Sequence, residues 1–181
     1  MASGAVGVRR RGRDRLVVAG RGALSPPSAI EPLLATLGRA AELDSPLFIH
    51  PGPGREPAGE AIDAPPWWPP LTRYVTQMHE AWLTLEAVGR RELPTLRIVY
   101  AMLAGLAPLH AERLLARGGP AVRHGSSFYD TSSYGPTAID AIAGCVGRER
   151  LLYGSDRPVV EPAAGEGNGP LRDNAAWLAE K

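Results

Sequence analysis

A histidine and an aspartate stand at the ends of short apolar runs, where reactive side chains commonly emerge from a sheet. His50 closes the run 46–49, and Asp156 closes the run that opens at Leu151. An imidazole and a carboxylate together suit Zn²⁺ or a similar divalent ion, whose bound water would be a nucleophile. Taken alone, each residue could equally serve the backbone, His50 by bonding a loop carbonyl and Asp156 by capping the turn before Pro158.

Other side chains are candidates for contact with a small-molecule substrate. Four prolines flank the pair Trp67 and Trp68 in the loop 52–70, and so much proline predicts no regular structure there. Long ordered loops are often functional, so the two tryptophans are expected to line a pocket. Met102 ends another predicted strand and is expected near the same cleft. Two further histidines are expected on the surface because neither ends a predicted strand: His110 and His124.

The bulk composition favours one domain and gives no sign of nucleic acid or membrane as a partner. The 181 residues are 44% apolar and carry a formal net charge of +1, which offers no general attraction to polyanions. No run approaches the roughly 18 apolar residues of a membrane span, and the N-terminus lacks a secretory apolar stretch. The single cysteine, Cys145, cannot form an internal disulfide and is expected to be buried on a helix. We therefore expect a soluble, cytoplasmic protein.

The apolar pattern predicts helices and strands that alternate along the chain. Apolar residues recur at helical spacing over 28–43, and Ser28 with Glu31 forms a capping box at the start of that stretch. A buried strand over 46–50 follows, and after the proline-rich loop one continuous apolar face predicts a helix over about 71–91. The remaining predicted elements are strands at 96–101, 128–131 and from Leu151, a helical pattern from Pro108 to Gly118, and a helix from Pro136 to Gly147.

Short apolar strands that alternate with helices indicate an α/β fold with a parallel sheet. The order is compatible with a barrel or with an open doubly wound sheet, and periodicity does not separate the two. Four strands are clear, and the run Leu16–Ala19 could supply a fifth. In either architecture the ligand site lies at the carboxyl ends of the strands, which is where His50 and Asp156 are predicted.

Three segments together resemble the amidohydrolase-related family, the branch that includes aminocarboxymuconate-semialdehyde decarboxylase. They are Pro46–Pro51, the stretch 96–114, and Phe128–Thr131 followed by 146–158 with its Gly-Ser-Asp-x-Pro ending. The resemblance implies a partial (β/α)8 barrel, with a metal-dependent hydrolase or non-oxidative decarboxylase activity on a small organic substrate. It also implies that His50 and Asp156 are metal ligands from the fifth and eighth barrel strands, and that Asp156 takes a proton from bound water. Residues 28–181 would then be the C-terminal half of a barrel, preceded by an Arg- and Gly-rich segment over 1–27.

The sequence departs from the family in two places that bear on catalysis. The family's first strand carries a His-x-His pair of ligands, whereas no histidine precedes His50 here. Where the family ends its sixth strand with a histidine, this chain has Met102, and a thioether does no acid-base work. Catalytic zinc sites generally keep three protein ligands, so weak or absent binding of Zn²⁺ is expected.

Two functional hypotheses follow from these departures. The first is an amidohydrolase-type enzyme impaired by its missing ligands. The second is a non-catalytic, truncated relative that acts as a binding or interaction scaffold. A half barrel would expose apolar side chains of its interior, so the chain is expected to be marginally stable and to form a homo-oligomer. The side chains predicted to face that interior are Leu47, Ile49, Ile98, Tyr100 and Leu152.

Overall fold

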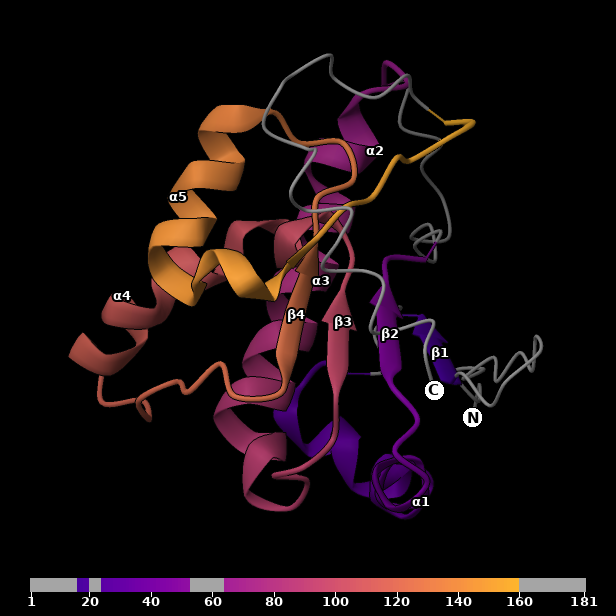
Figure 1. Cartoon of the computed structure of the whole chain (residues 1–181), viewed down its shortest axis with the longest axis vertical. Coiled ribbons are helices and arrows are strands. Elements are labelled where there is room, and N and C mark those ends of the chain that lie inside the picture. The colour runs from indigo at the N-terminus through magenta and orange to yellow at the C-terminus, as the bar shows by residue number, and fades with distance from the viewer. Residues whose placement is uncertain (1–15, 20–23, 53–63, 160–181) are drawn as a thin grey trace.

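A computed structural model describes residues 16–19, 24–52 and 64–159, without the side chains of 16–19. Within these ranges five parallel strands form one sheet in the order of the chain (Figure 1). The strands are β1 (Leu16–Ala19), β2 (Leu47–His50), β3 (Ile98–Tyr100), β4 (Ser127–Asp130) and β5 (Leu151–Leu152). The expected parallel sheet is therefore confirmed, including the fifth strand. Most of the Arg- and Gly-rich segment and everything after Val159 lie outside the described residues.

Helical segments connect the strands and cover the sheet. They are α1 (Leu34–Glu42), α2 (Trp68–Leu71), α3 (Arg73–Leu83), α4 (Ala111–Ala116) and α5 (Pro136–Val146). In Figure 1, α3 lies behind the sheet, α1 lies at its lower end, and α4 and α5 lie on the side of β4. Shorter helical turns complete the connections: Pro27–Leu33, Thr84–Val88, Gly89–Arg91, Met102–His110 and Arg148–Arg150. None of the described helices has the length and apolar content that crossing a bilayer would demand.

Each strand presents alternate side chains to the two faces of the sheet, and the helix-covered face holds the core. Leu47, Ile49, Ile98 and Tyr100 have at most 1% of their surface exposed and belong to the same apolar cluster as Met78 of α3. Our prediction that these four strand residues face the barrel interior is therefore wrong. The strands are apolar at nearly every position, so the sequence did not show which set meets the helices.

The residues between them in the strands point to the opposite face. Phe48, Val99 and Phe128 are register partners across β2, β3 and β4, and Leu152 pairs with Asp130 on the same face. Val99 and Leu152 are buried, while Phe48 and Phe128 are half-buried. Leu152 is the one residue of the predicted interior set that lies on this face.

Proline and glycine change several predicted boundaries. The first helix begins with a 3-10 segment after Pro26, no side chain caps it, and Pro32 lies inside it, so the predicted capping box is wrong. Regular structure does enter the proline-rich loop, because the prolines after Trp68 occupy the first turn of α2, where no amide donor is needed. Cys145 is exposed on α5, contrary to the prediction.

A left-handed turn follows β3. Met102, Leu103, Ala104, Gly105 and Leu106 all have positive φ, between 48° and 69°. Four of these residues are not glycine, and each such residue costs about 1–2 kcal/mol in this conformation. The turn is held against α3, where a Cβ on Gly105 would lie 3.0 Å from the Val75 carbonyl oxygen. It directs the chain from the end of β3 back into the helical layer.

The carboxyl edge of the sheet as candidate active site

Four residues of chemical interest lie at one edge of the sheet. Because the strands are parallel, their carboxyl ends share that edge, where His50 ends β2 and Asp130 ends β4. Met102 follows β3 closely, and Asp156 follows β5. His50 and Asp156 are thus at the same end of the sheet, as predicted. Two strands separate them, about 14 Å in a flat sheet, so their convergence in one cleft stays a prediction. We call this region the carboxyl edge.

His50 is exposed and is fixed through its ring and through the loop that follows it. Its Nδ1 lies 2.6 Å from the Pro51 carbonyl oxygen, and its ring stacks on Phe48 with centroids 6.2 Å apart. When Nδ1 donates to that oxygen, the lone pair of Nε2 is left for a ligand. The amide of Gln77 on α3 holds the backbone of Gly52 through two hydrogen bonds, of 2.9 and 3.1 Å. Sequence reasoning had not identified Gln77.

Asp130 and Asp156 form a pair of carboxyl groups with different surroundings. Burial raises the pKa of Asp130, and the charge of Asp156 raises it further, against hydrogen bonds from Ser132 and the Met102 backbone. The Ser132 amide donates to Asp130 Oδ1 at 3.0 Å. Asp156 accepts a hydrogen bond from the Ser133 hydroxyl. The net effect shifts the pKa of Asp130 upward, toward the neutral carboxyl group.

The loops at this edge are shaped to bring the two carboxyl groups together. Ser133 and Asp156 both have left-handed backbones, with φ of 67° and 53°. Gly154 of the Gly-Ser-Asp motif has no room for a side chain, because a Cβ there would collide with Asp130 and Ser132. The sequence analysis missed Asp130 and Ser133, although Asp130 ends a strand just as His50 does.

The three predicted substrate-binding residues lie in different surroundings. The Met102 amide donates to Asp130, and its half-buried side chain packs against the core. Trp67 and Trp68 are 57% and 44% exposed, and their rings lie 5.8 Å apart between centroids. Substrate contact by all three stays a prediction.

A second polar group lies beneath the sheet and has a different character. The buried carboxylate of Glu86 accepts hydrogen bonds from Tyr100 (2.8 Å) and Ser127 (2.6 Å) and forms an ion pair with Arg90 at 3.2 Å. Arg90 also donates to Ser127 at 2.6 Å. We call Glu86, Arg90, Tyr100 and Ser127 the core polar cluster. Every member of this cluster is paired, which is typical of a structural role.

His124 lies beside the core polar cluster, so the prediction that it is a surface residue is wrong. It is half-buried, and its Nδ1 lies 2.8 Å from the hydroxyl oxygen of Tyr129. The Trp82 indole donates to that hydroxyl at 3.2 Å. Burial lowers the pKa of His124, and the charge of Arg150 adds to the effect against that of Glu86. Local sequence gave no signal for this contact, which joins a loop to α3 and β4.

The donors at the carboxyl edge suit a divalent metal in type but not in number. His50 and Asp156 are one imidazole and one carboxylate, and catalytic zinc generally keeps three protein ligands. Among the residues that the structure describes, no group of three or more His, Cys, Asp or Glu side chains is arranged to hold a metal ion. The described residues therefore do not fit a complete metal centre.

Comparisons with known proteins agree on the fold. The family described as Amidohydrolase matches residues 2–179. A 2,6-dihydroxybenzoate decarboxylase from Rhizobium is 21% identical, with a TM-score of 0.65 over 80% of this chain and 54% of that one. A dihydroxybenzoic acid decarboxylase from Polaromonas sp. JS666, solved with manganese and 2-nitroresorcinol, is 17% identical, with a TM-score of 0.58 over 80% and 52%. A 4-oxalomesaconate hydratase from Rhodopseudomonas palustris is 18% identical, with a TM-score of 0.57 over 92% and 48%.

These structural relatives differ in chemistry, and this chain spans about half the length of each. At such identities the likeness establishes the architecture alone. No curated protein matches the sequence. The match over nearly the whole chain and the parallel β/α sheet show that this chain belongs to the amidohydrolase family and has the fold of a partial (β/α)8 barrel.

Proposed function

We propose that the carboxyl edge is this chain's share of an amidohydrolase-type active site, which decarboxylates or hydrolyses a small carboxylated organic molecule. The observation that carries the proposal is the placement of His50, Asp130 and Asp156 at the ends of three parallel strands on one edge. Active sites of β/α barrels lie at this edge. The decarboxylases among the structural relatives support decarboxylation as the first reaction to test.

The two carboxyl groups supply the acid-base chemistry in this proposal. Decarboxylation breaks the bond between a ring carbon and the carboxylate, and a proton takes the place of the carbon dioxide that leaves. Burial raises the pKa of Asp130, which suits it to act as the acid, and Asp156, which accepts a hydrogen bond from Ser133, would act as the base. Two neighbouring carboxyl groups in different surroundings, one of them buried, are typical of an acid-base pair.

A divalent metal would add the activation of water or of the substrate's oxygen atoms. The manganese in the Polaromonas relative supports such an ion for the family. Since His50 and Asp156 fall short of a three-ligand set, we expect this chain to bind Zn²⁺ weakly or not at all at micromolar concentration. Calorimetry that shows a stoichiometric sub-micromolar site, lost in His50→Ala, would contradict this expectation.

The activity itself is tested with 2,6-dihydroxybenzoate and millimolar Mn²⁺, by following resorcinol formation. We expect slow turnover that falls roughly 100-fold or more in Asp156→Asn, since a positioned acid or base contributes about that much. The matched control is Asp140→Asn, which makes the same change at a carboxylate on the exposed surface of α5. Turnover that survives Asp156→Asn would contradict the role of Asp156.

The second candidate function is a non-catalytic scaffold. Met102 at the end of β3 favours it, because the family has a histidine there, and so do the half-buried rings of Phe48 and Phe128. Under this reading the chain shows no turnover and associates with a second copy through that face. Sedimentation should then show a dimer or larger species, with Phe48→Ser shifting it toward the monomer. A monomer that turns over substrate would exclude the scaffold function.

A further inference from the structure

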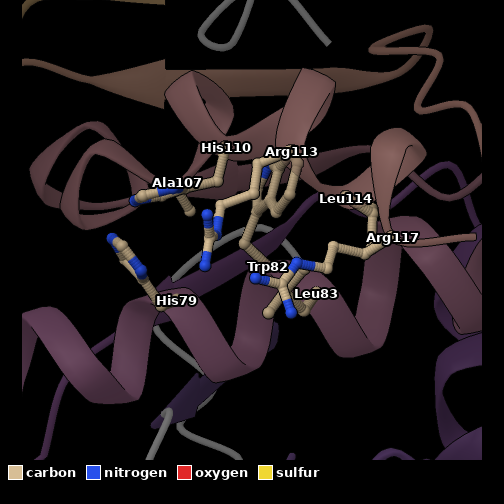
Figure 2. Close-up of a pocket in the computed structure, with 8 residues that line it drawn as sticks. All are labelled: His79, Trp82, Leu83, Ala107, His110, Arg113, Leu114 and Arg117. Atoms are coloured by element: carbon tan, nitrogen blue, oxygen red, sulfur yellow. The ribbon is translucent and has the colours of Figure 1, made fainter. Parts of the chain in front are cut away.

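A pocket of about 340 Å³ lies in the outer helical layer, between α3 and α4 (Figure 2). In Figure 2, α3 contributes His79, Trp82 and Leu83 from below, and the helical stretch around α4 contributes the remaining side chains from above. The pocket shares no lining residue with the carboxyl edge. The described residues that line it are His79, Trp82, Leu83, Ala107, His110, Arg113, Leu114 and Arg117.

The α4 side of this pocket has an unusual composition for a helix that faces another helix. His110, Arg113, Leu114 and Arg117 follow one another at spacings of three, one and three, which places them on one face of a helix. Such a stripe is apolar where two helices pack in full contact. Here two guanidinium groups occupy it, and they point into the space between the helices (Figure 2).

The described residues do not neutralise the positive charge of this pocket. Arg113 and Arg117 have no carboxylate partner among the described residues, whereas Arg39, Arg90, Arg97, Arg148 and Arg150 do. No acidic side chain is among the described residues that line the pocket. Two permanent positive charges therefore face a space that a negatively charged ligand could enter.

The two histidines of this pocket contact each other and the backbone of the left-handed turn. His79 Nε2 lies 2.6 Å from the Gly105 carbonyl oxygen, and its ring meets that of His110 edge to face, with centroids 5.2 Å apart. Burial lowers the pKa of His79, and the nearby His110 lowers it further against the hydrogen bond to Gly105. The lowered pKa favours neutral His79, whose Nε2 then donates to the Gly105 carbonyl oxygen.

The other half of the lining is apolar and favours an anion that has an apolar part. Trp82, Leu83, Ala107 and Leu114 offer carbon surface, which a hydrated inorganic ion cannot use. A planar carboxylate suits the forked donors of arginine, and an aromatic ring suits this floor. We propose that the pocket between α3 and α4 is a second site, which binds a small aromatic carboxylate through Arg113 and Arg117.

The test uses benzoate as the probe and two-dimensional NMR of the ¹⁵N-labelled chain. To keep it independent of the carboxyl edge, all variants carry His50→Ala and Asp156→Asn. Benzoate is expected to bind in the millimolar range and to shift the resonances of His79, His110 and Leu114. Arg113→Gln with Arg117→Gln should weaken binding by roughly tenfold or more, as expected for lost charged hydrogen bonds.

Three controls make the result specific. Arg39→Gln removes the same charge from the exposed surface of α1 and should leave the affinity unchanged. Benzamide, the neutral analogue, should not bind, and inorganic phosphate should bind more weakly than benzoate. Benzoate binding that persists in the double arginine variant, equal binding of benzamide or phosphate, or no binding at millimolar benzoate would each overturn the proposal.

Discussion

The core polar cluster and the carboxyl edge are both groups of polar residues on the same sheet, yet they differ in how their members are paired. Glu86 is buried and is paired with three protein groups, on Tyr100, Ser127 and Arg90. At the carboxyl edge, His50 is exposed, and among the described side chains Ser133 alone donates to Asp156. Buried polar groups must be paired to be tolerated, whereas groups that bind a ligand need unused bonding capacity. Pairing therefore separates the structural polar residues from the candidate functional ones.

Their backbones differ in the same sense. The core polar cluster lies on a helix and on strand positions of ordinary conformation, while Met102, Ser133 and Asp156 at the carboxyl edge have positive φ. Left-handed backbone at residues other than glycine costs free energy and is typical of functional loops. The packing of the fully buried core must offset that cost in free energy.

The largest effect is expected from breaking the core polar cluster. Glu86→Ala should lower the free energy of unfolding by about 3–5 kcal/mol, because it leaves the Arg90 charge and two hydroxyl groups without their acceptor. Urea denaturation measures the change. The control is Glu42→Ala, which removes an exposed ion pair with Arg39 and should cost less than about 1 kcal/mol. Equal effects of the two substitutions would contradict the structural role of the core polar cluster.

Substitution by alanine should change the stability in opposite directions at two glycines. Gly105→Ala should destabilise the chain by about 1–3 kcal/mol, because φ is +62° and the new Cβ would lie 3.2 Å from the Met78 Cβ. Gly144→Ala, within α5 and with open space around it, should instead stabilise by about 0.5–1 kcal/mol. Thermal unfolding of both variants gives the comparison, and a stabilising Gly105→Ala would show that the left-handed turn is wrong.

Beside the core, acid should weaken the fold through His124. Its pKa is lowered from 6.5 mainly by burial, so the unfolded chain binds the proton more readily and stability is lost as the pH falls below 6.5. Since His124 is only half-buried, the loss should stay below about 1 kcal/mol. The stability of His124→Gln, followed by urea denaturation from pH 7 to 5, should fall less steeply. Identical slopes for the two proteins would rule out this contribution.

The smallest effect is expected at the carboxyl edge, where Asp130 should weaken the fold as the pH rises, the reverse of His124. The pKa of Asp130 is raised from 3.8, first of all by burial, so the folded chain holds the proton and stability is lost as the pH rises above 3.8. Asp130→Asn keeps an oxygen for the Ser132 amide and removes this titration. The variant should gain about 0.5–1 kcal/mol at pH 7 and lose activity. A less stable Asp130→Asn at pH 7 would mean that the charged form is the favoured one.

The sequence by itself determined the order of strands and helices and the edge where chemistry is expected. The run 47–49 lies between Pro46 and Pro51 with His50 at its end, and 98–100 is a β-branched and aromatic run after Pro94, so both strands follow from the local pattern. Placing His50 and Asp156 at one edge needed only parallel strands, which short apolar strands between helices imply.

Only the tertiary structure decided which face of each strand meets the helices and which polar residues meet one another. Leu47 and Phe48 are both apolar, so their alternation carries no direction until α3 covers one side. The contact of Glu86 with Ser127 spans 41 positions in the chain, and the pocket that Arg113 and Arg117 line forms only where α4 lies against α3. Contacts of this kind leave no local signature, because each partner by itself has the composition of an ordinary helix or strand.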